Sequence, residues 1–439
     1  TNPALRILGL PNLPKKLPSR NWMIFWTVST AIAAAIIYDK REKKRNIAKW
    51  RHAVEHLANE PLPSGSFGLA QPRKLTIYLS APPGDSLRSA QDHYTEYVKP
   101  ILAASGLDWE FVQGRREGDI RAYVAERIRR VRRSVEGKEE RDPTKPPSKE
   151  EIVEEFRKSR GIRDYDGIRG DIVIGRHTWK EYLRGLHEGW LGPLAPPPEP
   201  EPLPSATPSE DTSESDKKSE EKKEEKKPEG EEKKPKRPPQ PKPHNTTADY
   251  PSSPLPPHIP PAFHPTAPIR EPHLLGFLNT PIRLYRYFNR RKLADDIGRE
   301  VAAVCLCTYR EFRQLQANPD STPSDNEPWN QPAQYEQQAE LAWEEKDWVK
   351  SVWKEADQVD PEVPEKVRPK PIVMDPRIAI RMRRFALTPT DEERVSRIIV
   401  PEEEVEGWIK GNLRALYRWG YQKAFVKEKR TPLEDKDVD

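Results

Sequence analysis

Residues 74–80 read KLTIYLS, and residues 81–85 read APPGD. The β-branched and aromatic residues of the first stretch are typical of a strand, and the prolines and glycine of the second end it. A helix should follow over about residues 87–104, because apolar residues recur there at intervals of three and four. They are Ala90, Tyr94, Tyr97, Val98 and Ile101. This strand–turn–helix unit is the start of the folded part of the chain.

The same alternation recurs further along the chain. Residues 108–112 (DWEFV) and 171–175 (DIVIG) are typical of strands, and helices are expected at about 118–135 and 177–188. Strands that alternate with helices favour an α/β domain with a largely parallel sheet, here over residues 73–194.

Ligands of parallel sheets bind beyond the carboxyl ends of the strands. Asp85, Asp171 and His177 are candidates to meet there, although single Asp and His residues at strand ends are more typical of turn caps. A nucleotide site has little support, because the chain contains neither GxGxxG after the first strand nor GxxxxGK[ST]. The sequence predicts no catalytic residue, no cofactor-binding residue and no metal ligand.

Eight arginines crowd the helix expected at 118–135 and the turn before it. They are Arg115, Arg116, Arg121, Arg127, Arg129, Arg130, Arg132 and Arg133. A solvated basic face on an amphipathic helix is one interpretation, with Ile120, Val124, Ile128 and Val131 as its apolar stripe. Contact with an anionic lipid surface or an acidic partner is the other.

Upstream of the α/β pattern lies an apolar stretch, WMIFWTVSTAIAAAIIY at residues 22–38, with no charged residue. Its 17 residues form about 25 Å of helix, a short but sufficient membrane span. Trp22, Trp26 and Tyr38 suit the membrane interfaces, and Thr27, Ala31 and Ala35 share a helix face that allows close helix approach, although alanines are also simply frequent in spans. A cleaved signal peptide and a buried core helix are the alternatives.

The flanks of this span bear on targeting and topology. Residues 1–38 contain Arg6, Lys15, Lys16 and Arg20 but no acidic residue, which suits mitochondrial targeting, although Pro11, Pro14 and Pro18 interrupt an amphipathic helix. The stretch 40–51 holds seven basic residues, so the positive-inside rule alone would keep the bulk of the protein on the inner side.

Composition divides the rest of the chain. With 49 prolines and 33% charged residues in 439, part of the chain cannot bury enough apolar surface to fold. The sequence predicts a basic amino-terminal segment (1–21), a transmembrane helix (22–38), a tether helix and loop (39–72), the α/β domain (73–194), a disordered linker (195–272) and an α+β region (273–439). Strand character is expected at 301–308 and 378–385, and helices at 334–354 and from residue 401.

The helix that starts at residue 401 is expected to turn an apolar face inward. That face consists of Val405, Trp408, Ile409, Leu413, Leu416 and Tyr417. Cys305 and Cys307 exclude a disulfide-rich scaffold, and their spacing places both on one face of the expected strand. The net charge of +5 does not suggest a dedicated nucleic-acid binder.

Five parts of the chain carry a family resemblance: the anchor, KLTIYLSAPPGDSLRSA, GRHTWKEYLRGLHEGWLGPL, LLGFLNTPIRLYRYFNRR and VEGWIKGNLRALYRWGYQKAF. Together they resemble the Tim54 family, the membrane-anchored subunit of the mitochondrial carrier translocase. The resemblance covers nearly all folded sequence. It implies a single-pass inner-membrane protein with its bulk in the intermembrane space, in a hetero-oligomeric complex with the carrier-import channel subunit and small Tim chaperones. This topology opposes the charge count, but long domains can translocate regardless of charge.

The resulting prediction is a non-catalytic scaffold without a cofactor. The rival is a membrane-tethered enzyme or lipid-binding protein, because the first strand–turn–helix somewhat resembles the opening of the diacylglycerol-kinase fold. That family needs an NPxSG-like turn and a GGDGT-like loop, whereas this chain has APPGD at 81–85 and no GGDGT. A tethered nucleic-acid binder would depend on the arginine helix alone.

Overall fold

The computed structural model describes residues 19–60, 72–136, 149–162, 165, 167–196, 240–315, 334–353, 365–406 and 408–425. Predictions for the basic residues before 19, the charged insertion at 138–148 and the Glu/Lys-rich stretch at 197–239 lie outside these residues.

The described chain builds one six-stranded sheet in the order β2-β1-β3-β4-β6-β5. Its strands are β1 (Lys74–Ser80), β2 (Asp108–Gly114), β3 (Gly170–Ile174), β4 (Thr266–Ile269), β5 (Tyr309–Glu311) and β6 (Arg383–Phe385). The first four are parallel to their neighbours, and β4 pairs with β6 in parallel through Thr266 and Arg384. Only β5 is antiparallel, at the edge. The predicted α/β class with a largely parallel sheet is confirmed.

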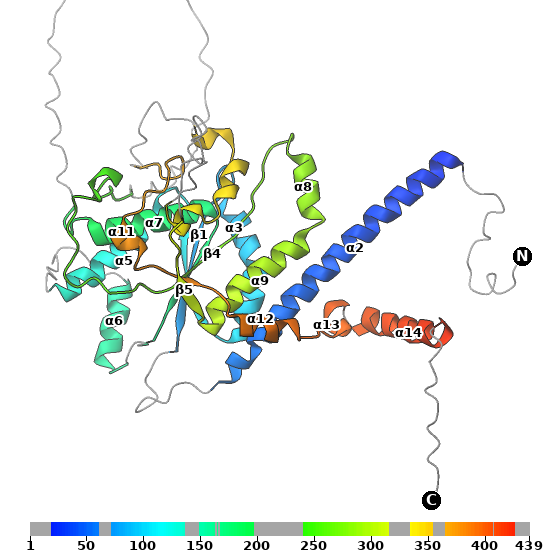
Figure 1. Ribbon diagram of the computed structural model, residues 1–439. Helices are drawn as coiled ribbons and strands as arrows, with labels where there is room; N and C mark the ends of the chain where they lie inside the picture. The colour runs from blue at the N-terminus through cyan, green and yellow to red at the C-terminus, as the bar shows by residue number, and fades with distance from the viewer. Residues whose placement is uncertain are drawn as a thin grey trace, which may run out of the picture.

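Helices cover both faces of the sheet (Figure 1). Because side chains alternate along a strand, Leu75, Ile77 and Leu79 of β1 face one layer and Tyr78 faces the other. The first layer contains α2 (Arg20–Val54), α3 (Leu87–His93), the π-helical η2 (Tyr94–Val98), α4 (Lys99–Ser105) and α9 (Arg290–Leu306). The second contains α5 (Asp119–Val135) and α7 (Arg176–Leu191).

The remaining elements surround these layers. They are η1 (Glu55–Asn59), α6 (Lys149–Ser159), η3 (Thr247–Asp249), α8 (Thr280–Tyr287), α10 (Glu336–Ala339), η4 (Ala342–Asp347), η5 (Lys350–Trp353), α11 (Pro376–Ala379), α12 (Pro389–Ser396), α13 (Glu402–Glu406) and α14 (Trp408–Phe425).

The strand order creates a switch point between β1 and β3. The chain leaves β1 through α3 and α4 on one face and leaves β2 through α5 on the other, so the connections diverge from this pair of strands. In doubly wound sheets, the crevice beyond the carboxyl ends of such a pair is where ligands bind. The loops after Ser80 and Ile174 lie at this edge.

Residues on both sides of the predicted linker share this sheet. The linker was expected over residues 195–272, but the part from residue 240 is described, and its β4 pairs with β3. Tyr250, Ala267 and Ile269 are buried there. The abundant prolines concealed this packing because proline is depleted in strands, yet β4 contains Pro268 and lies between β3 and β6.

Several predicted elements differ from the structure. Residues 301–306 belong to helix α9, so Cys305 is buried on a helix and Cys307 is its left-handed cap; the predicted strand is wrong. Residues 334–353 contain three short helical pieces where one helix was expected over 334–354, and the first break lies at Leu341, whose φ is 58°. The strand expected at 378–385 begins only at Arg383.

The apolar face predicted near the carboxyl terminus was expected to be buried, but most of its described residues are exposed. Val405 is buried, but Leu413, Leu416 and Tyr417 of α14 are 62%, 63% and 72% exposed. Helical periodicity indicates that one face of a helix is apolar, but it does not indicate whether the protein core, a membrane or a partner buries that face.

Candidate functional site

The candidate membrane anchor is the amino-terminal half of α2. Among the described residues, one helix, Arg20–Asn59, is long and apolar enough to cross a membrane, and none of its most apolar window is buried. Figure 1 shows this half projecting away from the sheet and its helices. The alternative of a buried core helix is therefore wrong.

The predicted anchor residues all lie on this projecting half. Trp22 and Trp26 stack with ring centroids 6.3 Å apart, and each is 56% exposed. Tyr38, at the other end, is 54% exposed, and Thr27, Ala31 and Ala35 are exposed between them. Thr27 donates a hydrogen bond to the carbonyl oxygen of Ile24, which satisfies its hydroxyl within the helix.

Beyond Tyr38 the same helix enters the folded body without a break. The tether was expected as a separate helix at about 42–59, but α2 continues unbroken to Val54 and η1 follows it. Asp39 is the first buried residue and receives a hydrogen bond from the guanidinium of Arg291 at 3.2 Å. Lys43 pairs with Glu96, and burial lowers the pKa of Lys43.

The buried half of α2 packs against α9. Trp50 is 3% exposed and donates from Nε1 to Asp295 at 2.9 Å. Its ring lies directly over Gly298 of α9, where an added Cβ would lie 2.2 Å from the nearest ring carbon. Glycine at 298 therefore lets the two helix backbones approach closely.

Charged pairs tie α2 to α13. Arg41 pairs with Glu402 and, at 2.9 Å, with Glu406, and Arg45 contacts Glu402 at 2.8 Å. His52 lies between Glu55 and Glu404, whose carboxylates raise its pKa. These contacts fix the direction in which the projecting half of α2 leaves the body.

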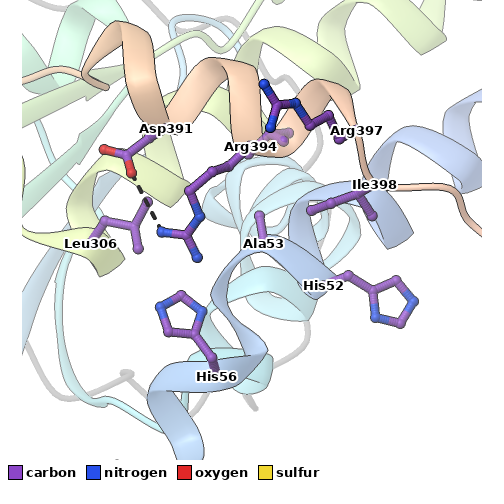
Figure 2. A pocket seen from close by; sticks show the side chains of 9 residues that line it. His52, Ala53, His56, Leu306, Asp391, Arg394, Arg397 and Ile398 are labelled. Atoms are coloured by element: carbon purple, nitrogen blue, oxygen red, sulfur yellow. Dashed lines mark ion pairs between the residues drawn. The ribbon is translucent and has the colours of Figure 1, made fainter.

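A hollow of about 370 Å³ lies where α2, α9 and α12 meet (Figure 2). Ala53, Leu306 and Ile398 form its apolar wall, and the imidazole of His56 points toward it in Figure 2. Arg394 contacts Asp391 at 3.7 Å beside it. Arg394 and Arg397 are largely exposed, so the hollow is a surface depression without a buried polar group to bind a ligand.

The arginines proposed for an anionic surface divide into two groups. Arg121 and Arg129 are 1% and 2% exposed, and both contact the buried carboxylate of Glu188. Arg127 donates to the Tyr78 hydroxyl at 2.7 Å, and Arg132 donates to the carbonyl oxygens of Gly189 and Gly192. Arg121, Arg129 and Arg132 face the protein interior, whereas the side chain of Arg127 is 37% exposed.

The other four lie further out. Arg115 is exposed, and its backbone N–H donates to Asp119. Arg133 contacts Glu126. Arg116 and Arg130 are half-buried and have partners. In the apolar stripe, Ile128 still packs against the core but Val131 is 53% exposed, so the stripe is covered only as far as Ile128.

The crevice beyond β1 and β3 is filled by the chain itself. Glu344 is 2% exposed and accepts hydrogen bonds from the backbone N–H groups of Arg176 and Glu271, both at 2.8 Å. The N–H of Arg176 opens α7, a position at which a helix binds anions. The carboxyl group of Glu344 therefore occupies the amino-terminal end of α7.

Further side chains seal the same edge. Arg176 donates to Glu345 at 2.7 Å, and the ammonium of Lys180 donates to the carbonyl oxygens of Arg368 and Lys370. Burial lowers the pKa of Lys180 to about 8. Arg368 donates to the carbonyl oxygen of Ala81 at 2.8 Å, so residues of 336–353 and 365–370 close over the ends of β1 and β3.

Two of the three predicted candidates lie at this edge. His177 is 2% exposed, contacts the carbonyl oxygen of Ser80 at 3.0 Å, and has its pKa lowered to about 3 by burial. Asp85 lies 3.5 Å from His273. Asp171, by contrast, lies near the amino end of β3 and accepts from the Tyr182 hydroxyl at 2.7 Å, so the structure does not bring it to the other two.

Sequence reasoning missed the acids of this edge. Glu271 lies in the stretch expected to be linker, and Glu344 lies in the stretch expected to be a helix at 334–354, so neither was expected at a strand end. Gly175 offered a signal. Its φ is 85°, and an added Cβ would lie 2.7 Å from Glu271, so only glycine fits this turn. Among the described residues, no group of three or more His, Cys, Asp or Glu could hold a metal ion.

These buried acids predict a pH dependence of stability. Burial, followed by the neighbouring carboxyl of Glu344, raises the pKa of Glu271, and burial raises that of Glu344 to about 7. Because the folded state holds these protons more tightly than the unfolded state, stability contributed at acid pH is lost as the pH rises from about 4.5 through 7. We expect Glu271→Gln to reduce this decline, measured by urea unfolding of the full chain in detergent at pH 5 and at pH 8. An equal decline in both proteins would contradict the assignment.

The family model and the related proteins that match this chain all indicate the same family. The model of the family "Inner membrane protein import complex subunit Tim54" matches residues 2–385. A Neurospora crassa protein named mitochondrial import inner membrane translocase subunit tim54 is 73% identical over 439 residues, which is all of this chain and 92% of the relative. The Aspergillus oryzae protein of the same name is 46% identical over 91% of each chain. The Saccharomyces cerevisiae protein is 33% identical over 44% of this chain and 51% of its own length.

Proposed function

Because the chain belongs to the Tim54 family of inner-membrane protein import subunits, we propose that it is a non-catalytic scaffold of the mitochondrial translocase that inserts multi-spanning carrier proteins. In this proposal it is anchored once in the inner membrane, and its bulk lies in the intermembrane space. There it organises the channel subunit and the small Tim chaperones.

The observation that carries the scaffold role is the continuity of α2. One helix of 35 residues includes both the candidate span and a segment buried against α9. A helix without a break transmits orientation, whereas a loop at the membrane surface would leave the body free to rotate. The pairs of Asp39 with Arg291 and of Arg41 with Glu402 support a fixed orientation of the body at the membrane.

The side chains that fill the crevice at the carboxyl ends of β1 and β3 support a role without catalysis. The crevice at which this architecture binds ligands contains Glu344, Glu345 and Arg368 from the same chain. Opening it would leave the buried Lys180 and Arg176 without their partners, which is costly. We infer that this edge has a structural role and that the protein acts through its surface.

A purification experiment tests this proposal. The tagged full chain is purified from mitochondria in mild detergent, and the accompanying proteins are identified by mass spectrometry. We expect the channel subunit and small Tim proteins to be recovered. Protease should digest the bulk only after the outer membrane is ruptured. Recovery of the chain alone, or protection of its bulk in mitoplasts, would overturn the partner set or the topology.

A helix break at the membrane boundary tests the rigid connection. Lys40 is exposed and lies two residues after Tyr38, the last residue of the predicted span. Lys40→Pro removes a backbone hydrogen bond and kinks the helix at a local cost of about 3 kcal/mol. We expect the variant to remain inserted and folded by circular dichroism but to recover less of its partner subunits, whereas Lys40→Ala should behave like the parent. Undiminished recovery with Lys40→Pro would show that the fixed orientation is not needed.

A further inference from the structure

The segment before α9 exposes an unusual amount of apolar surface. Phe277 and Leu278 are 89% and 90% exposed, and Tyr285 is 65% exposed. Ile282 and Leu284 on α8 are also about half exposed. The whole of Thr280–Tyr285 is exposed, so α8 stands away from the core and is not one of its packed helices. Exposed patches of this kind mark interaction sites.

Such a short helix is not expected to be stable without cover. An isolated helix of fewer than about 12 residues is marginal in water, and α8 has eight. It is held at its ends. Asn279 donates to the carbonyl oxygen of Leu275 at 2.7 Å, and Arg286 pairs with Asp347 and lies 5.8 Å from the centre of the Trp343 ring. These contacts fix the position of α8 but do not cover its apolar side chains.

The position of α8 relative to the candidate span indicates what covers it. Arg291, four residues after α8, contacts Asp39 and lies 5.3 Å from the centre of the Tyr38 ring. Tyr38 is the last residue of the apolar stretch of α2. The contacts of Arg291 therefore place the carboxyl-terminal end of α8 near the point at which α2 enters the membrane. Figure 1 shows α8 and the projecting half of α2 extending to the same side of the sheet.

The charges of this segment match an anionic surface. Residues 276–292 contain five basic residues and no acidic one. Arg286, Arg290 and Arg291 pair with acidic residues of the folded body. Arg283 and Lys292, both exposed, are the two that can meet lipid phosphates. Interfacial segments combine Trp, Tyr, Phe or Leu with Lys or Arg in this way, because apolar side chains enter the acyl boundary while cations meet lipid phosphates. Arg283 is exposed and donates to the carbonyl oxygen of Gly276, which holds its guanidinium beside Phe277 and Leu278.

We propose that residues 277–287 lie on the anionic phospholipid surface at which α2 enters the membrane. Phe277 and Leu278 insert between lipids, Tyr285 lies at the headgroups, and Arg283 pairs with phosphate. The body is thus held to the membrane at two places, α2 and α8. This inference depends on the span and not on the import role, so it can fail while the proposed function stands.

The test places an environment-sensitive fluorophore (NBD) at two positions. A Cys305→Ala, Cys307→Ser background of the full chain receives Leu278→Cys or, as the control, Val153→Cys. Val153 is 45% exposed on the amphipathic helix α6, which Figure 1 shows on the side away from the projecting half of α2. Each protein is reconstituted in vesicles of phosphatidylcholine with or without phosphatidylglycerol, and each vesicle is also prepared with brominated acyl chains.

We expect the label at 278 to show blue-shifted emission that brominated lipid quenches several-fold more than at 153, with stronger quenching when phosphatidylglycerol is present. Adding Arg283→Glu should reduce the effect of phosphatidylglycerol. Circular dichroism confirms folding of each variant. Equal quenching at 278 and 153 would overturn the proposal, and so would a label at 278 that is shielded only when other translocase subunits are bound, because a protein would then be the cover.

Discussion

Replacing Glu188 by alanine is expected to destabilise the full chain by about 3–5 kcal/mol. The Glu188 side chain is fully buried, contacts Arg121, and lies 2.9 Å from Arg129. Its removal would leave two guanidinium groups, 1% and 2% exposed, without their shared carboxylate. Urea unfolding in detergent, followed by far-ultraviolet circular dichroism, measures the change.

The control for this prediction is Glu126→Ala. Glu126 also contacts Arg129, at 3.2 Å, but its side chain is 47% exposed. Pairs with an exposed partner contribute about 0–1 kcal/mol. Arg129 also keeps its buried partner Glu188 in this variant, at 2.9 Å, so no buried charge is left unpaired. If both variants lost the same stability, the buried cluster would not be the source of the effect.

The Glu188 cluster also predicts sensitivity to acid. Burial by itself would raise the pKa of Glu188, but Arg121 and Arg129 together lower it below its usual value. A carboxyl whose pKa is lowered in the folded state contributes stability at neutral pH that is lost as the pH falls through that value. The Glu188 cluster therefore loses stability as the pH falls, whereas Glu271 and Glu344 lose it as the pH rises. Comparing Glu188→Ala with Glu271→Gln separates these two contributions.

Replacing Trp50 by alanine is expected to cost about 3–5 kcal/mol, because it leaves a cavity over Gly298 and removes the partner of Asp295. Trp50 is the largest side chain that α2 contributes to the core. The loss should therefore loosen the body from the membrane helix as well as lower global stability. Urea unfolding gives the first quantity, and limited proteolysis of the reconstituted chain near residue 54 gives the second.

The matched control is Lys44→Ala on the same helix. Lys44 is exposed, so truncation removes little packing and should change stability by less than about 0.5 kcal/mol. A loss with Trp50→Ala no greater than with Lys44→Ala would indicate that α2 is not held by the core beyond the membrane boundary.

Local patterns predicted much of the backbone. The helix residues Ala90, Tyr94 and Ile101 are buried as their spacing indicated, and β1 was placed at 74–80 without error. The burial pattern of this helix and the position of β1 depend on residues that are close together in the sequence. A local pattern is therefore enough to predict them. The membrane span was predictable for the same reason, since its signal is a continuous apolar run.

The sequence by itself determined the α/β alternation, the apolar anchor and the family resemblance. Only the tertiary structure decided that Arg121 and Arg129 face Glu188 and not solvent, that Leu416 of α14 is exposed, and that Glu344 fills the crevice at the switch point. Arg121 and Glu188 are 67 positions apart, and Arg176 and Glu344 are 168 apart. A charge or an apolar stripe has the same sequence pattern whether water, lipid or a distant partner meets it, because its energy depends on surroundings that the folded chain brings together.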